Sequence, residues 1–534
     1  MRGQQKQAIS RSLGASLLLW ALLDPGALAW AQEVVPSPRF DIQRFEITGN
    51  TLLSSDEIER IVAPFTGSQK GLADVQGAVK ALDQGYRERG FGVVQVLLPE
   101  QTVNRSVIQI RVTEPRVSRV LIGGNKHFDN DNVRYSLPTV KEGETPNSHR
   151  IARNLQMLGE HPLKQTQVLL RSGAAEGQVD VNVKVDDNKP WRIAFTLDDT
   201  GTSDTGYLRS GIGYQHTNLF NRDHTLTAQY ITSPTYPSRV SIYGLGYRIP
   251  FYHLNGTLDL IAGYSDVASG TVQGLFSVSG SGTIFGARWG YFLPKWGELE
   301  QKATLGIDYR AFKNDVTLAG VGLVPDITIH PVSLVYSGIL RQAASQLNFH
   351  AGVSTNIPGG DDGRSADFQA ARTGATANYT IFRYGLHYAH AFQKDWQMRA
   401  AYNGQYTSDS LVPGEQLGLG GPDSVRGYLL REVSGDRGYA AQLELQTPDL
   451  ARLMGAPDDY RARLIAFYDF GSVQRNNAFP SEQQSKFIAS TGVGVRFNYS
   501  KSVNLRFDVA QILKDAGTRQ SSNQRISAGL ALIF

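Results

Sequence analysis

From about Lys189 to its end, the chain consists of stretches of about ten residues that alternate apolar and polar side chains, separated by clusters of Gly, Pro, Asn and Asp. In the stretch KATLGIDYR, the apolar face carries Ala303, Leu305, Ile307 and Tyr309. Successive side chains of a strand point to opposite faces, so this period of two predicts strands with one apolar face each. Such strands occur in soluble sandwiches and in membrane barrels, and a single strand fits both.

Three features of the same region favour the membrane barrel. Aromatic residues gather at the ends of the stretches, as they do at lipid interfaces, and small residues share the apolar faces with large ones, which lipid tolerates better than a close-packed core does. The last stretch, RISAGLALIF, keeps its alternation up to the terminal Phe534. At about 20 residues per strand with its connection, the region holds about 16 strands. We therefore expect a transmembrane antiparallel β-barrel over residues 190–534.

Two similar units precede this region, over residues 40–115 and 116–189. Each is predicted to run strand, helix, helix, strand, strand, and the two align at ITGN, which contains Gly49, and at IGGN, which contains Gly124. Glycine at this point can take the positive φ that ends a strand before a helix. Because the same signal recurs at the same place, the sequence predicts two α/β domains built on one plan.

The N-terminus has the organisation of an export signal. Basic residues precede the apolar run LGASLLLWALL, Asp24 ends the run, and Ala29 and Ala31 supply an A-x-A cleavage pattern. A membrane anchor needs about 17 to 25 apolar residues, and this run has about half that number. We expect a signal peptide over residues 1–31 and a short segment, residues 32–39, before the first unit.

The composition excludes several classes of protein. The net charge of +4 is small for 534 residues, and the 53 basic and 49 acidic residues are interspersed, which argues against a nucleic-acid partner. The absence of cysteine excludes disulfides and thiolate chemistry. The chain also lacks an H-E-x-x-H, a P-loop and a G-x-S-x-G motif. We expect no catalytic residues, no metal site and no cofactor, and therefore no enzyme.

A short motif between two of the predicted strands, GGPDSVRGY, holds a single arginine among glycines. A loop that only has to turn needs Asn, Asp and Gly rather than Val425, Arg426, Gly427 and Tyr428. The stretch FYDFG, residues 467–471, follows further along the chain. A signal peptide, two α/β units and a C-terminal barrel with these two motifs resemble the Omp85 superfamily. The two-unit form most resembles the outer-membrane transporters of two-partner secretion, the haemolysin and filamentous-haemagglutinin secretion proteins.

The resemblance implies that the two units are POTRA domains and that the VRGY loop folds back into the barrel lumen. There Arg426 would meet the aspartate of the second motif, Asp469, which is flanked by Phe467 and Gly471. The strand pattern allows this independently, because the apolar alternation of RARLIAFYDFG turns Phe467 and Asp469 inward. A charge-assisted contact between arginine and aspartate would pin the loop inside. The alternative is an exposed loop arginine and a solvated strand aspartate.

The family implies a pore that recognises an unfolded partner exoprotein through its periplasmic domains and translocates it to the cell surface. The partner is then a large secreted protein, adhesin-like or haemolysin-like, with an N-terminal secretion domain. Outer-membrane lipid and the barrel assembly machinery are further expected partners, with Phe534 as the C-terminal assembly signal. The implied location is the bacterial outer membrane, with the POTRA-like domains in the periplasm.

Two other functions fit part of the pattern. An Omp85-type insertase that assembles outer-membrane proteins has the same fold, but such family members usually carry more repeats. A passive porin would explain the barrel and neither the repeats nor the paired motifs. In one respect the chain departs from the family, whose members can carry a plug helix before the first POTRA domain. Residues 32–40 are too few for a helix and a tether across a barrel, so either the inserted loop alone narrows the pore or occlusion is handled differently.

Overall fold

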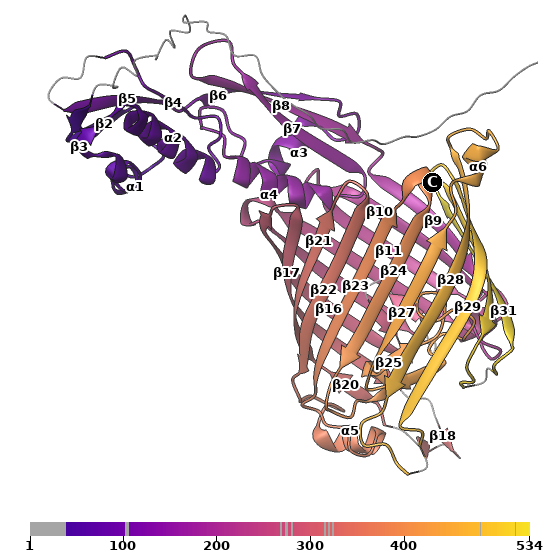
Figure 1. The fold of residues 1–534 in the computed structure, drawn as a ribbon. Helices are drawn as coiled ribbons and strands as arrows, with labels where there is room; N and C mark the ends of the chain where they lie inside the picture. Colours follow the sequence, from indigo (N-terminus) through magenta and orange to yellow (C-terminus); the bar gives the residue numbers. More distant parts are fainter. Residues whose placement is uncertain are drawn as a thin grey trace, which may run out of the picture.

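The structure is a computed structural model in which two α/β units lie at one end of a large barrel (Figure 1). It describes residues 39–101, 106–266, 270–272, 276–278, 281–313, 317–318, 321–322, 325–480, 482–517 and 520–534. The expected signal peptide, residues 1–31, lies outside the described residues. None of the helices that the structure describes is long and apolar enough to cross a membrane.

The first unit is a small α/β layer with its own core. Its elements are β1 (Phe40–Ile42), β2 (Arg44–Thr48), α1 (Ser55–Val62), η1 (Ala63–Phe65), β3 (Gly67–Lys70), α2 (Leu72–Glu88), β4 (Gln95–Leu97) and β5 (Val107–Thr113). The central strand β5 pairs parallel with β2 and antiparallel with β4. Leu82 and Tyr86 on one face of α2 share a buried core with Ile108 and Ile110 of β5.

The second unit repeats this plan. Its elements are β6 (Arg116–Gly123), α3 (Asn130–Ser136), α4 (Ser148–Gly159), β7 (Lys164–Ser172) and β8 (Gln178–Asp187). The sheet order is β6-β8-β7, with β6 parallel to β8. Gly49 and Gly124 have φ of 85° and 90°, which confirms the predicted turn glycines. A Cβ at Gly49 would lie 2.2 Å from the carbonyl oxygen of Val112, and one at Gly124 would lie 2.4 Å from that of Val185.

Within the described residues, sixteen antiparallel strands close into a barrel when β20 and β21, which flank His330 and both pair with β17, count as one. The last strand pairs with the first and closes the ring. The strands are β9 (Trp191–Asp198), β10 (Arg209–Leu219), β11 (His224–Thr232), β12 (Ser241–Phe251), β13 (Gly256–Ser265), β16 (Ser281–Trp296), β17 (Leu299–Lys313), β20 (Ile327–Ile329), β21 (Pro331–Arg341), β22 (Ser345–Asn356), β23 (Thr380–Ala391), β24 (Gln397–Tyr406), β27 (Arg437–Gln446), β28 (Tyr460–Gln474), β29 (Ser485–Tyr499), β30 (Val503–Ile512) and β31 (Gln524–Ile533).

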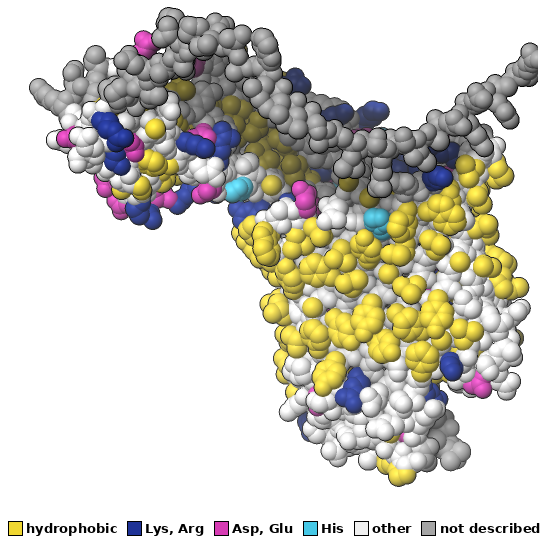
Figure 2. All heavy atoms as spheres, in the orientation of Figure 1, with side chains coloured by type: hydrophobic (Ala, Val, Ile, Leu, Met, Phe, Trp, Pro, Cys, Tyr) yellow, Lys and Arg dark blue, Asp and Glu magenta, His cyan; other side chains and the backbone are white. Residues whose placement is uncertain are grey.

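The apolar face of the strands is the outer face of the barrel. Leu305, Ile307 and Tyr309 of β17 are 55%, 54% and 41% exposed, whereas Asp308 between them is buried. Figure 2 shows hydrophobic side chains gathered in a broad band over the outer wall, with polar atoms toward the end away from the α/β units. A soluble sandwich would bury this face, so the sandwich alternative is wrong and a lipid-facing barrel fits the pattern.

The two ends of the barrel differ. Tight turns face the α/β units, and longer connections lie at the opposite end, where α5 is drawn (Figure 1). The chain terminus lies at the end near the α/β units (Figure 1). The shorter elements are η2 (Pro237–Arg239), η3 (Tyr252–Leu254), β14 (Gly270–Val272), β15 (Phe276–Val278), β18 (Thr317–Leu318), β19 (Val321–Gly322), α5 (Ser365–Ala371), η4 (Gln393–Asp395), η5 (Pro413–Glu415), β25 (Leu417–Leu419), β26 (Val433–Gly435) and α6 (Leu450–Leu453).

Candidate functional site

The loop between β24 and β27, residues 407–436, folds back against the inner wall of the barrel. Its strands β25 and β26 pair as a hairpin, and the VRGY motif lies at the tip between them. Val425 and Tyr428 are buried in one apolar cluster with Ile488 of β29 and Ile512 of β30. The Tyr428 hydroxyl also donates to the carbonyl oxygen of Ala489 at 3.1 Å. The tip is therefore packed against two wall strands and hydrogen-bonded to one of them.

Arg426 lies at the centre of this contact and is 5% exposed. Its Nε and Nη2 donate to the two carboxylate oxygens of Asp469 at 2.6 and 2.8 Å, a bidentate pair, and its backbone N–H donates to Oδ2 at 3.1 Å. The guanidinium also lies 3.6 Å from the ring centroid of Phe467. Both charges are removed from solvent, and the planar fork fixes the orientation of the loop as well as its distance from the wall.

The FYDFG strand presents its three motif residues to the lumen. Phe467 and Asp469 on β28 are buried, while Tyr468 between them is 41% exposed, so the predicted alternation is confirmed. Gly471 faces the loop: a Cβ there would lie 2.8 Å from Cδ1 of Leu419 on β25. The structure therefore places Phe467 beneath the arginine, Asp469 against it and Gly471 beneath the hairpin.

Gly427 is required by the turn that follows the arginine. Its φ is 92°, a conformation that residues with a Cβ rarely adopt. A Cβ would also approach Cβ of Ala510 to 3.2 Å and Cγ1 of Ile512 to 3.3 Å. Glycine therefore allows Arg426 and Tyr428 to reach different wall strands from adjacent positions in the loop.

Sequence reasoning missed the second acidic partner, Glu444 of β27. Its Oε2 accepts from Nη1 of Arg426 at 2.9 Å and lies 3.8 Å from Nη2 of Arg496 on β29. The signal was present, because Glu444 alternates in the stretch QLELQ with Leu443 and Leu445, which are exposed on the outer face. A buried inward carboxylate needs a cation, but the pattern alone does not say which one.

The terminal Phe534 lies on the outer face, 67% exposed, at the seam that closes the barrel. Its backbone N–H donates to the carbonyl oxygen of Ile193 at 2.9 Å, and Ile193 donates back at 3.1 Å. Its ring meets that of Phe195 edge-on, with 6.1 Å between centroids. The chain terminus is therefore paired with the first barrel strand.

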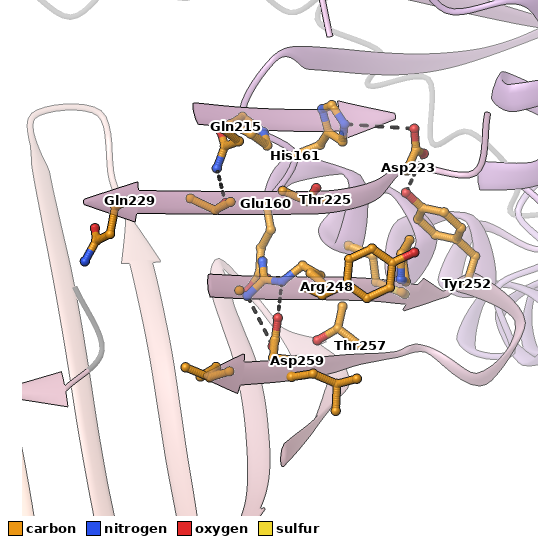
Figure 3. A pocket seen from close by; sticks show the side chains of 18 residues that line it. Glu160, His161, Gln215, Asp223, Thr225, Gln229, Arg248, Tyr252, Thr257 and Asp259 are labelled. Carbon is orange, nitrogen blue, oxygen red and sulfur yellow. Dashed lines mark hydrogen bonds and ion pairs between the residues drawn. The ribbon is translucent and has the colours of Figure 1, made fainter. Parts of the chain in front are cut away.

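A second polar site joins the second α/β unit to the barrel. Nζ of Lys164, at the start of β7, donates to both carboxylate oxygens of Asp223 at 2.8 and 2.6 Å and to Oδ1 of Asn132 at 2.7 Å. Asp223 lies in the turn between β10 and β11, and it also accepts from the Tyr252 hydroxyl at 2.7 Å. Figure 3 shows Tyr252 and His161 directed at Asp223 from two sides. We call Lys164, Asp223, Asn132, Tyr252 and His161 the junction cluster.

The junction cluster is buried, and burial perturbs its pKa values. Burial raises the pKa of Tyr252, and the Asp223 carboxylate raises it further. Burial lowers the pKa of Lys164, with Asp223 opposing the shift, and it lowers the pKa of His161. Nδ1 of His161 accepts from the backbone N–H of Leu163 at 3.3 Å, so its proton is assigned to Nε2, which lies 3.1 Å from a carbonyl oxygen.

Beside the junction cluster, Glu160 at the end of α4 reaches the inner wall of the barrel. Its carboxylate accepts from Nζ of Lys302 at 2.9 Å and from Nη1 of Arg248 at 3.3 Å. Arg248 also donates to Asp259 on the next strand at 2.6 Å (Figure 3). The second α/β unit is therefore fixed to the mouth of the barrel by buried and exposed ion pairs on several turns and strands.

The sequence model of the haemolysin secretion/activation protein family ShlB/FhaC/HecB matches residues 177–497, more than half of the chain. The chain belongs to this family. The ShlB-type POTRA domain matches residues 40–115, the first α/β unit.

Several relatives and solved structures are similar over most of the chain. The outer membrane transporter CdiB of Escherichia coli O6:K15:H31 is 24% identical, over 85% of this chain and 76% of its own length. The heme/hemopexin transporter protein HuxB of Haemophilus influenzae strain 86-028NP is 20% identical, over 87% of this chain and 82% of its own length. The solved structure of CdiB from Escherichia coli has a TM-score of 0.73 at 19% identity and covers 96% of this chain and 93% of its own.

Family and fold together make the chain an outer-membrane transporter of the two-partner secretion type, with its POTRA domains in the periplasm. The expected family, fold, location and transport function are confirmed. The family serves a secreted partner protein, which is the cargo class of this chain. Because the relatives are named as transporters, the insertase alternative has less support.

Proposed function

We propose that this transporter exports one unfolded exoprotein and that the VRGY loop, pinned by Arg426 to Asp469, controls the width of the lumen through which it passes. The observation that carries the proposal is the buried bidentate pair at 2.6 and 2.8 Å inside the barrel. An arginine–carboxylate contact of this kind holds the loop tip in place, and the tip is released when either the arginine or the carboxylate is removed. Transport therefore requires the pair to be present and properly oriented.

We infer the following domain organisation of the chain. Residues 1–31 form the signal peptide, residues 32–39 a short N-terminal segment, residues 40–115 and 116–189 the two POTRA domains, and residues 190–534 the barrel. In the POTRA sheets, β4 and β7 are edge strands that pair with one neighbour each. An extended cargo segment can add to such an edge by main-chain hydrogen bonds, which tolerate a varied sequence.

The outer surface supplies two further proposed partners. The exposed apolar side chains of the barrel contact outer-membrane lipid, and Phe534 at the seam is recognised by the barrel assembly machinery during insertion. Support for the second proposal comes from the exposed ring of Phe534 beside Phe195 at the point where the barrel closes.

The test of the proposal compares Arg426→Ala and Arg426→Lys with the wild type. The alanine variant should reduce secretion of the exoprotein, because the loop loses its buried anchor. The barrel should still assemble, because Tyr428 continues to pack against the wall. Lysine keeps the charge but loses the fork, so it should restore secretion only in part. Arg475→Ala is the control, because Arg475 pairs with Glu482 in a loop outside the motif.

The readout is the secreted and outer-membrane proteome of cells with and without the chain, together with the variants. Loss of one large protein from the medium, with the other barrels intact, supports dedicated export and identifies the cargo. Broad depletion of unrelated barrels would point to the insertase instead. Secretion by Arg426→Ala at the wild-type level would remove the role of the loop anchor.

A further inference from the structure

Three arginines stand side by side on adjacent strands of the barrel wall. In the strand register, Arg463 of β28 lies opposite Arg496 of β29, and Arg496 lies opposite Arg506 of β30. All three face the lumen, because Leu464 and Leu505, their neighbours in sequence, are exposed on the outer face. Like charges placed directly opposite one another destabilise a sheet, so this row is unfavourable for the fold on its own.

Two more arginines extend the row into a larger surface. One cavity of about 540 Å³ is lined by Arg399 of β24, by Arg461 of β28 and by the three arginines of the row. Of its described lining residues, only Asp198 carries a carboxylate, and the other polar groups are uncharged: the hydroxyl of Thr196 and the amides of Gln397, Gln446, Asn498 and Asn504. We call these five arginines the arginine surface.

The arginine surface is incompletely neutralised by the protein. Arg496 pairs with Asp508 at 2.8 Å, and Arg463 pairs with Asp395 at 2.7 Å. Arg399 and Arg461 are exposed and line the lumen cavity, and neither forms an ion pair within 4 Å among the described residues, although Arg399 lies opposite Glu444 in the strand register. The surface therefore has guanidinium groups available for an anion from outside.

The contact that Arg506 makes indicates that such an anion would be a carboxylate of a polypeptide. Nη1 of Arg506 lies 3.8 Å from a carboxylate oxygen of Asp423, which belongs to the VRGY loop and is 94% exposed. The side chain of Arg506 lies across Gly529 of β31, where a Cβ would come within 2.6 Å of its Nε. The loop thus already places one carboxylate of a polypeptide at the edge of the arginine surface, in a loose contact that another carboxylate can replace.

The position of the surface fits a passing chain. Arg461 and Asn498 lie near the ends of β28 and β29 that meet the turn at Ser500–Ser502. The C-terminus lies at this end of the barrel, which is the end near the α/β units (Figure 1). A neighbouring cavity of about 310 Å³ shares Arg399, Arg496 and Arg506 and is also lined by Arg426, with carboxylates from Asp423, Glu444 and Asp508 among these arginines. The arginine surface therefore runs from the periplasmic part of the lumen to the loop anchor.

We propose that the arginine surface binds acidic side chains of the exported polypeptide as it enters the lumen. This inference rests on the proposed export function and adds the chemistry by which the lumen recognises its cargo. The planar guanidinium fork matches a carboxylate, and several exposed pairs of this kind are individually weak, which allows an extended chain to move from one to the next. An acidic segment also displaces Asp423 from Arg506, which couples entry of cargo to the loop.

A direct test measures binding of a fluorescent decaglutamate peptide to the full chain purified in detergent. The double variant Arg399→Gln/Arg461→Gln should raise the Kd about tenfold, as expected for the loss of two exposed pairs. Arg399→Lys/Arg461→Lys should retain most of the affinity because the charges remain. Arg452→Gln, on α6 outside the lumen, is the matched control and should bind as the wild type does.

Each other outcome overturns the proposal. Equal binding by the glutamine variant would show that the peptide binds elsewhere. Equal binding of a decalysine peptide would exclude charge recognition, and competition by inorganic phosphate at the same concentration as the peptide would mean an unspecific anion site. Normal heat-modifiability of the barrel on a gel shows that each variant is folded.

An export assay with the same variants separates the failure of this inference from that of the proposed function. If the wild type exports its exoprotein and the glutamine variant exports it at the same rate, the arginine surface has no role in export, and the proposed function stands. If the wild type exports no exoprotein, the proposed function is wrong whatever the peptide binds.

Discussion

Removing the buried cation of the junction cluster should release the second α/β unit from the barrel. Lys164 is completely buried, and its ammonium group donates three hydrogen bonds, two of them to Asp223. In Lys164→Met, the Asp223 carboxylate stays buried with hydrogen-bond donors but no cation. Breaking a buried ion pair from one side costs about 3–5 kcal/mol. Since about 1.4 kcal/mol corresponds to a factor of ten, the junction should open roughly 140-fold to 3700-fold more often.

A second variant tests whether the uncompensated charge is the cause. Lys164→Met/Asp223→Asn removes both charges and leaves an amide oxygen that accepts from the Tyr252 hydroxyl. The cost should fall to about 1–2 kcal/mol, because replacing both partners of a buried pair is much less destabilising than removing one. Lys184→Met is the control, because Lys184 is exposed on β8 of the same domain.

Hydrogen exchange of the backbone amides in the β10–β11 turn measures the opening. Protection should fall in Lys164→Met, return largely in the double variant and stay unchanged in Lys184→Met. Two results would refute the reasoning: wild-type protection in Lys164→Met, or a double variant as unprotected as the single one. The second result would mean that packing of the lysine, and not its charge, holds the domain to the barrel.

Three further predictions follow from the site. Gly427→Ala should expose the loop to protease about tenfold more often, because a side chain at a φ of 92° costs about 1–2 kcal/mol; unchanged cleavage of residues 420–432 would contradict this. The pKa of His161 is lowered from 6.5 in the folded junction, so junction stability is fully present above about pH 6.5 and is lost as the pH falls toward the folded-state pKa. Protection factors of the β10–β11 turn, corrected for the pH dependence of intrinsic exchange, should fall between pH 7.5 and 5.5, and His161→Gln should flatten that dependence. Deletion of Phe534 should lower the yield of heat-modifiable barrel, whereas a normal yield would remove its role in assembly.

The architecture was predictable because it depends on period and on composition, which are local. Ala303 to Tyr309 alternate in the sequence as they do on the wall, and the count of strands follows from the length of the region. The closure of β31 on β9 joins residues more than 300 positions apart, and nothing in either strand specifies its partner. Only the resemblance to a known family, carried by VRGY and FYDFG, pointed to a loop inside the lumen.

The missed residues share a physical reason. Asp223 lies in a turn, where aspartate is expected for its own local hydrogen bonds, so nothing marked it as the buried partner of Lys164 from another domain. In the sequence, each arginine of the row is only one polar residue of an alternating strand: Arg463, Arg496 and Arg506. They become a row only through the register of three strands, and register depends on turn geometry and packing that the alternation does not fix.

The three polar sites occupy successive positions along one route. The junction cluster holds the second α/β unit at the mouth of the barrel, and the arginine surface begins near that end. The Arg426 anchor lies beyond it, with Glu444 within reach of both Arg426 and Arg496. An acidic segment bound at Arg496 competes with Glu444 for that arginine and thereby changes the charge beside the anchor. Glu444 therefore links the proposed cargo-binding surface to the anchor, because its carboxylate lies within 4 Å of both Arg426 and Arg496.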